Sequence, residues 1–261
     1  MDDAEKAGKR FTELVRILDV LRGENGCPWD RQQDEKTLVN YFLEESYEVI
    51  DSVFNKKPDS VAEELGDMLM EIVFLARLYK EKADFCMSDV VEGINRKMIR
   101  RHPHVFGDHS AADADEVTAS WNRQKNTEKN RESLFDGISS CTPALLTAFQ
   151  IGLRASLSGF DWSETAAVIG KVKEEMLELE EAVGEKDPQG IMEEIGDLLF
   201  GLANLSRHLG VNPEIALQFA NRKFITRFRF IEKKLKDQGR DIDGASLEEM
   251  EELWQLAKKE R

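Results

Sequence analysis

The stretch that decides the fold is KVKEEMLELEEAVGEKDPQGIMEEIGDLLFGLANL, residues 171–205. It contains two acidic pairs, Glu175 with Glu178 and Glu194 with Asp197, and the members of each pair are three residues apart. Residues at this spacing lie on one face of a helix, one turn apart. A short polar segment with Gly and Pro separates the pairs, and these residue types interrupt helices. The stretch therefore predicts an antiparallel helix pair.

Four carboxylates converge if the acidic faces of these two helices meet. Such a cluster repels itself unless a cation lies in it. The spacing offers only oxygen ligands, without Cys or His, and this favours Mg²⁺ or Mn²⁺ over zinc. A di-iron bundle would normally supply Glu-x-x-His, which is missing here. The plainer alternative, solvated helix faces, would be preferred for a single pair. The predicted metal ligands and catalytic residues are Glu175, Glu178, Glu194 and Asp197.

The same pattern occurs earlier in the chain. LEESYEVIDSV (43–53) aligns with KEEMLELEEAV (173–183), and EELGDMLMEIVFLARL (63–78) aligns with EEIGDLLFGLANLSRH (193–208). A repeat of this length predicts two tandem units, which we place at 1–130 and 138–261. The tryptophans repeat as well, Trp29 with Trp162 and Trp121 with Trp254. A second candidate metal site consists of Glu45, Glu48, Glu64 and Asp67.

Helical periodicity extends over the whole chain, and no run alternates as a strand would. The sequence therefore predicts an all-α fold. Ser60 and Ser246 are predicted N-caps, and Ser88 or Asp89 is expected to start another helix. The most apolar helices are interrupted only by polar or small residues such as Glu71 and Gly201. Expected helices cover 11–21, 37–54, 60–79, 90–101, 116–132, 149–157, 165–183, 189–209, 213–236 and the residues after Ser246.

Composition narrows the class of partner. The chain has 261 residues, 41% hydrophobic and 33% charged, with a formal net charge of −15. This charge argues against nucleic acid and against an anionic membrane surface as partners, but not against a nucleotide bound through a cation. The first residues lack the apolar core of a secretory signal, and no apolar run is long enough to span a bilayer. Three scattered cysteines fit reduced thiols, so we expect a cytoplasmic protein.

Basic residues follow the acids at a fixed distance in both copies. Lys223 and Arg227 share a helix face, as do Lys97 and Arg101 in the first copy. Beside a metal-loaded cluster they are suited to phosphate oxygens, although alone they would be ordinary surface charge. Trp254 either stacks on a base or anchors the last helix. Metals, basic residues and no covalent nucleophile indicate metal-assisted hydrolysis of a polyphosphate.

Three histidines are an alternative candidate for a metal site. His102, His104 and His109 lie in a segment that contains Pro, without helical spacing or a neighbouring cysteine. Loop histidines are the favoured interpretation, ahead of a zinc site.

The CPWD segment (27–30), the doubled acidic pairs, the EELGD and EEIGD boxes and the NRKF tract (221–224) together resemble the MazG family of nucleoside triphosphate pyrophosphohydrolases, in its tandem two-domain form. The resemblance covers nearly the whole chain. It implies two tandem all-α four-helix units that dimerise through their helices, dependence on Mg²⁺, and hydrolysis of nucleoside and deoxynucleoside triphosphates to a monophosphate and pyrophosphate. It also implies broad base tolerance and a role in removing unwanted nucleotides.

The resemblance also implies a nucleotide-binding set and makes the C-terminal copy the main catalytic unit, with the first copy binding weakly or serving assembly. Two other interpretations remain open at this point: a non-catalytic helical module that senses nucleotides, and a purely structural bundle. The implied nucleotide contacts are Lys171, Val172, Lys173, Glu174, Glu175, Gly190, Ile191, Met192, Glu193, Asp197, Lys223, Phe224, Ile225, Thr226, Arg227 and Trp254.

Overall fold

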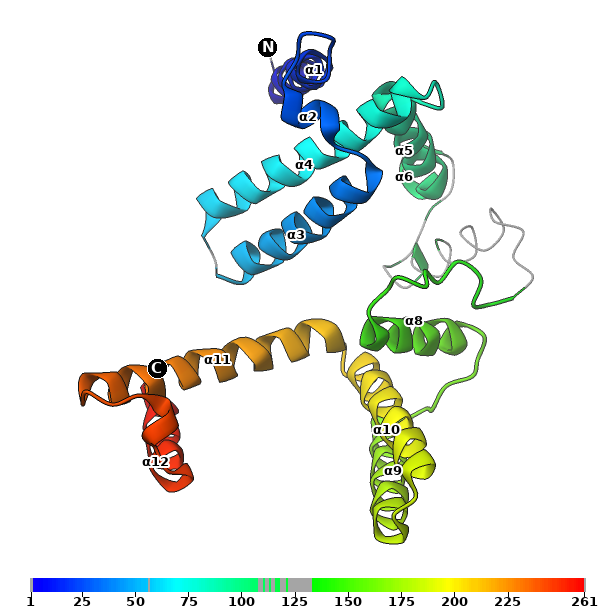
Figure 1. Cartoon of the computed structure of the whole chain (residues 1–261). Coiled ribbons are helices and arrows are strands. Elements are labelled where there is room, and N and C mark those ends of the chain that lie inside the picture. The colour runs from blue at the N-terminus through cyan, green and yellow to red at the C-terminus, as the bar shows by residue number, and fades with distance from the viewer. Residues whose placement is uncertain are drawn as a thin grey trace. The chain divides into compact units, whose positions relative to one another are not determined.

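The computed structural model describes residues 2–55, 57–107, 110, 113, 116–117, 121 and 133–260. Over these residues the chain forms α-helices and one short 3₁₀-helix, with no strand, so the predicted all-α fold is confirmed (Figure 1). The chain divides into two compact units, Met1–Glu128 and Lys129–Arg261. Among the described helices, none has the length and apolar character needed to cross a membrane.

The first unit is built around the hairpin of α3 and α4. These two helices pack along each other, α1 packs across α4, and α5 packs against α4 (Figure 1). The short loop between α3 and α4 makes the hairpin antiparallel, as the sequence predicts. The described helices of this unit are α1 (Asp3–Leu21), α2 (Pro28–Gln32), α3 (Glu35–Phe54), α4 (Pro58–Glu81), α5 (Met87–Arg101) and α6 (Pro103–Phe106).

The core of the first unit lies where α1, α3 and α4 meet. Leu18 of α1, Leu38 of α3 and Phe74 of α4 are each 2% exposed and pack in one cluster. The guanidinium of Arg22 closes the edge of this core. It donates to Glu81 at 2.7 Å and to the Gln33 carbonyl at 3.2 Å, and so links the end of α1 to α4 and to the end of α2.

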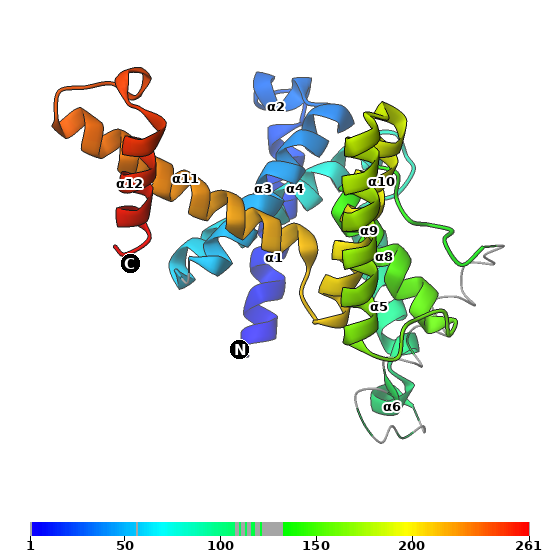
Figure 2. The ribbon, with the colours of Figure 1, turned by 90° about the horizontal axis from the view of Figure 1, so that it is seen from below.

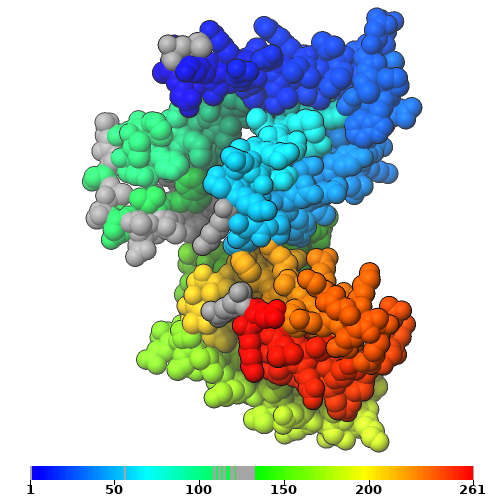
Figure 3. Space-filling model, turned by 90° about the vertical axis from the view of Figure 1, so that its left-hand side faces the viewer, coloured from blue at the N-terminus to red at the C-terminus, as the bar shows by residue number. Residues whose placement is uncertain are grey.

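The second unit repeats the hairpin with α9 and α10, and α8 packs on α10. Helix α11 contacts α8 and α10 and then leads away from the hairpin (Figures 1 and 2). In the space-filling view the red α12 lies against the orange α11 (Figure 3). The elements of this unit are α8 (Ala144–Leu157), α9 (Thr165–Glu185), α10 (Pro188–His208), α11 (Pro213–Asp237), η1 (Ile242–Gly244) and α12 (Leu247–Ala257).

Several predicted helix starts are wrong. Helix α1 begins at Asp3 rather than at residue 11, α3 at Glu35 rather than at 37, and α8 at Ala144 rather than at 149. Helix α4 begins at Pro58 rather than after Ser60, because proline suits the first helical turn, where its missing N–H is not needed. Helix α5 begins after Cys86, and Asp89 lies inside it, accepting a hydrogen bond from the Cys86 backbone N–H at 2.8 Å. The predicted cap at Ser246 is confirmed by its bond from the Glu249 N–H at 3.3 Å. The expected helix over 116–132 lies mostly outside the described residues.

The core makes a direct prediction about stability. Leu18→Ala removes a side chain that is 2% exposed, and we expect it to cost about 2–5 kcal/mol of unfolding free energy, measured by urea unfolding. Val20→Ala is the matched control on the same helix, because Val20 is 70% exposed and its loss should cost less than about 0.5 kcal/mol. Equal costs for the two variants would contradict the packing described for α1.

Candidate functional site

The acidic pairs of α9 and α10 come together in the second unit. Carboxylate oxygens of Glu175, Glu194 and Asp197 lie within 4.8 Å of one another. Glu175 is only 7% exposed, although it is charged, whereas Asp197 is open to solvent. One oxygen of Glu194, Oε2, is buried without a hydrogen-bond partner in the part of the chain that the structure describes. An all-oxygen cluster with an unsatisfied buried carboxylate oxygen fits a hard divalent cation.

Repulsion among these carboxylates contributes to raised pKa values of Glu194 and Glu178. Burial first, and then the negative charges of Glu175 and Asp197, raise the pKa of Glu194. Burial also raises the pKa of Glu178; nearby Lys171 opposes the shift, while Glu175 and Glu194 add to it. Glu178 therefore belongs to the same electrostatic group as the other three acids. Each of these shifts means that the ionised cluster is unfavourable by itself, which a bound cation would relieve.

Lys171 supplies the one positive charge that the described residues place inside this cluster. Its ammonium lies 2.7 Å from Glu174 and 2.8 Å from Glu175. Hydrogen bonds to these two carboxylates raise the pKa of Lys171, so the side chain stays charged. The sequence predicted a nucleotide contact for Lys171, and its position beside the acids leaves that prediction open.

The first unit assembles the equivalent acids on α3 and α4. Carboxylate oxygens of Glu45, Glu64 and Asp67 lie within 4.8 Å of one another. Burial, followed by the charge of Glu48, raises the pKa values of both Glu45 and Glu64. Three of the four acids of the second candidate site therefore lie close together, and the charge of Glu48 acts on two of them. Tyr41 occupies the position of Lys171, so this cluster lacks the lysine of the other.

Glu71 lies beside the acids of the first unit and was not among the predicted site residues. It lies one turn beyond Asp67 on α4 and is 5% exposed. Burial, and then the charges of Glu45 and Asp67, raise the pKa of Glu71 to about 7. The signal was present in the sequence, since an isolated glutamate in the apolar part of α4 falls on the face of the predicted acids. It was interpreted only as an interruption of an apolar run.

The predicted basic and aromatic residues form a separate group on α11 and α12. The guanidinium of Arg227 lies over the Trp254 ring at 5.5 Å, and the rings of Phe224 and Trp254 are 5.0 Å apart. The first unit repeats the contact, with Arg101 over Trp121 at 5.1 Å. Trp254 thus anchors α12 to α11, which agrees with one of the two roles predicted for it.

The predicted nucleotide contacts therefore fall into two groups within one chain. One group lies on the hairpin, on α9 around Lys171 and on the first turns of α10. The other group, from Lys223 to Arg227 with Trp254, lies on the part of α11 that leads away from the hairpin (Figures 1 and 2). The two groups do not meet within the second unit.

Among the described residues, neither the histidines nor the hollow along α1 offers an alternative to the acidic clusters as the functional site. His102 bonds the Met98 carbonyl through Nδ1 at 2.7 Å and lies against Trp121, and His109 is outside the described residues. Within the described ranges, no histidine or cysteine belongs to a group with metal-ligand geometry.

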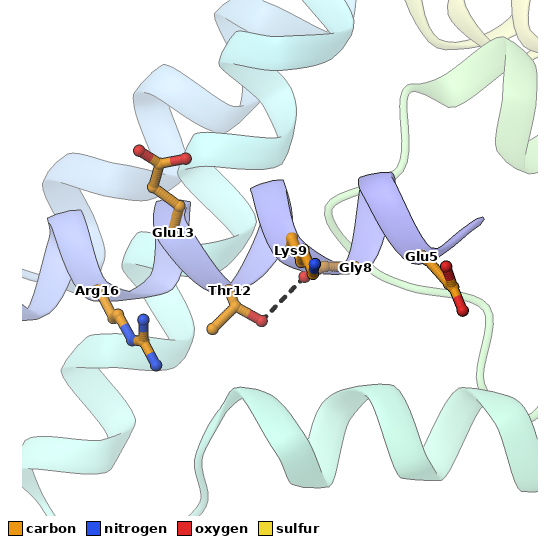
Figure 4. Close-up of a pocket in the computed structure, with 6 residues that line it drawn as sticks. All are labelled: Glu5, Gly8, Lys9, Thr12, Glu13 and Arg16. Carbon is orange, nitrogen blue, oxygen red and sulfur yellow. Dashed lines mark hydrogen bonds between the residues drawn. The ribbon is translucent and has the colours of Figure 1, made fainter. Parts of the chain in front are cut away.

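The hollow in Figure 4 is formed by one helix, with a single internal hydrogen bond of 2.9 Å from Thr12 to the Gly8 carbonyl. It is lined by Glu5, Gly8, Lys9, Thr12, Glu13 and Arg16 of α1.

Comparison with known proteins gives the family. The model of the MazG nucleotide pyrophosphohydrolase domain matches residues 33–106 and 164–230, which contain both hairpins. A nucleoside triphosphate pyrophosphohydrolase/pyrophosphatase MazG of Thermotoga maritima is 42% identical over 97% of this chain and 98% of its own length. A nucleoside triphosphate pyrophosphohydrolase of Escherichia coli K12 is 44% identical over 96% and 98%. An uncharacterized protein, YabN, of Bacillus subtilis is 39% identical over 95% of this chain and 51% of its own.

These matches cover both repeats and both acidic clusters, in a chain whose described residues form helices and no strand. The chain therefore belongs to the MazG nucleotide pyrophosphohydrolase family of enzymes.

Proposed function

We propose that this chain hydrolyses nucleoside and deoxynucleoside triphosphates to the monophosphate and pyrophosphate with Mg²⁺ as cofactor, and with broad tolerance for the base. The role is removal of unwanted nucleotides in the cytoplasm. The observation that carries the proposal is the convergence of Glu175, Glu194 and Asp197 within 4.8 Å on α9 and α10. The names of the full-length relatives support the substrate class.

Each residue has a distinct part in this reaction. Glu175, Glu178, Glu194 and Asp197 hold the cation, and Mn²⁺ has the ligand preferences to replace it. A bound divalent ion orients and activates water and offsets charge on the phosphates. Lys223 and Arg227 bind phosphate oxygens, and Trp254 packs beside the base. Water adds to phosphorus, the bond between the α- and β-phosphates breaks, and pyrophosphate leaves.

The same proposal divides labour between the units, 1–130 and 138–261. The second unit carries most turnover because its cluster includes Lys171 beside the acids. The first binds nucleotide weakly or serves assembly. The relatives named as pyrophosphohydrolases align over both units and do not assign turnover to one of them.

A homodimer completes the site in this proposal. Helices α9 and α10 leave large apolar side chains in solvent, such as Leu177 at 60% and Met192 at 64% exposure. Apolar surface in this quantity indicates an interface. Helix α11 leads away from its own hairpin, so Lys223 and Arg227 serve the hairpin of a second copy in this proposal (Figure 1).

Comparing the two acidic clusters tests the division of labour. Glu194→Gln removes a proposed metal ligand from the second unit, and we expect pyrophosphate release to fall on the order of 100-fold or more, because several kcal/mol of charge stabilisation are lost. Glu64→Gln makes the same change in the first unit and should leave most of the rate. Equal losses would refute the assignment, and no pyrophosphate release by the unaltered protein with Mg²⁺ would favour a nucleotide-sensing module.

Subunit complementation tests the shared site. One chain carries Glu194→Gln, the other carries Lys223→Ala with Arg227→Ala, and heterodimers are isolated with two different tags. If acids and bases come from different copies, one of the two symmetric sites is intact, and about half of the wild-type rate should return. A heterodimer of Glu194→Gln with Glu175→Gln is the control, since the acidic cluster of each copy is then damaged and neither site is intact. A mixed heterodimer as inactive as its parents would place each site within one chain.

A further inference from the structure

Helix α12 buries little apolar surface. It packs along α11, and among its residues, all of which the structure describes, Ala257 alone is buried, at 8% exposure. Its leucines at 247 and 256 are 74% and 49% exposed. Because the hydrophobic contribution scales with the apolar area removed from water, it is small here. Polar contacts therefore take a large part in fixing α12 on α11.

Arg240 connects the end of α11 to the start of α12. Gly239 has a φ of +71°, in the left-handed region, and after this turn the Arg240 backbone N–H donates to the Leu235 carbonyl of α11 at 3.0 Å. The Arg240 guanidinium donates to both carboxylate oxygens of Glu249, in the first turn of α12, at 2.6 and 2.8 Å. It also donates to the Gly244 carbonyl at 2.9 Å. One residue thus contacts both helices and the loop between them.

The geometry of this ion pair is bidentate. A planar guanidinium that donates two hydrogen bonds to one carboxylate fixes orientation as well as distance. The same bonds raise the pKa of Arg240 and lower the pKa of Glu249, so both groups are charged at neutral pH. Their side chains are 41% and 31% exposed, so the pair contributes more to geometry than to global stability.

Trp254 lies further along the helix that this ion pair fixes. It follows Glu249 by five residues, which is about 7.5 Å along the helix axis. The Trp254 ring lies 5.0 Å from the ring of Phe224 and 5.5 Å from the guanidinium of Arg227. Trp254 and Arg227 are both nucleotide contacts in the proposed function. The position of α12 therefore decides where these two side chains lie relative to each other.

We propose that Arg240 is a positioning residue for nucleotide binding: through Glu249 it fixes α12, so that Trp254 stays beside Arg227 before nucleotide arrives. The inference rests on the proposed function, since it concerns two of its nucleotide contacts, and it adds a residue that is not among them. The proposed metal ligands lie on other helices, so loss of Arg240 weakens binding and spares the chemical step. The alternative is a surface ion pair without effect on nucleotide.

Binding of a non-hydrolysable deoxynucleoside triphosphate with Mg²⁺, measured by calorimetry on the full chain, tests the proposal. Arg240→Ala should raise Kd about 3–10-fold, because a mobile Trp254 must then be ordered on binding. Arg240→Lys keeps the charge but not the bidentate geometry, and it should restore part of the affinity. Glu252→Gln is the matched control, since it removes another exposed acid of α12, and it should leave Kd unchanged.

A double-mutant cycle separates positioning through Trp254 from general damage. Trp254→Ala should weaken binding by itself, and Arg240→Ala should add no further loss in that background. Amide hydrogen exchange in α12 should be faster in Arg240→Ala than in the unaltered protein, and unchanged in Glu252→Gln. Pyrophosphate release by Arg240→Ala at saturating nucleotide should stay within about twofold of the unaltered rate.

Three results would overturn the proposal: an unchanged Kd in Arg240→Ala, an equal loss of affinity with and without Trp254, or unchanged exchange in α12. The proposed function fails separately, if the unaltered protein binds nucleotide but releases no pyrophosphate, and the Kd comparisons then still decide the role of Arg240. A protein that binds no nucleotide would refute both.

Discussion

Repulsion among carboxylates on neighbouring helices is the constraint on which this molecule depends. Each hairpin turns acids from two helices toward one point, and in both units burial and like charge raise the pKa values of the glutamates that meet there. A fold that gathers charge in this way stores an unfavourable interaction, and a divalent cation converts it into a favourable one. The helix pairing that forms the hydrophobic contacts therefore also brings the acidic side chains together.

Duplication lets one scaffold hold two different electrostatic environments. Lys171 offsets part of the charge in the second unit, whereas the first unit adds Glu71 and has Tyr41 in place of the lysine. A less negative cluster leaves room for a polyphosphate, which brings its own negative charge. The two acidic clusters therefore differ in their charged residues at two aligned positions.

Sequence periodicity predicted most of the fold, because the acidic and apolar residues recur at helical spacing twice in the chain. The convergence of Glu175, Glu194 and Asp197 followed from the same spacing, since residues on facing sides of a short hairpin must meet. Helix starts were harder to predict. Helix α4 begins at Pro58 rather than after Ser60, and α5 begins after Cys86 rather than at Ser88, because a helix start depends on backbone geometry that residue spacing does not encode.

Two other features needed the structure. The spacing places Glu71 on the same face of α4 as the predicted acids, but its burial depends on how α3 covers α4, which the spacing does not show. The direction of α11 depends on the turn after His208 and on few contacts with α8 and α10, so the separation of Lys223 and Arg227 from the acids was not visible in the sequence.

The most direct test of the central claim is anomalous X-ray scattering from crystals grown with Mn²⁺ and a non-hydrolysable deoxynucleoside triphosphate. The account predicts a strong peak between α9 and α10, about 2.0–2.2 Å from carboxylate oxygens of Glu175, Glu194 and Asp197, with phosphate oxygens on its open side. Bound nucleotide with no manganese peak at these carboxylates, or with manganese held elsewhere, would contradict it.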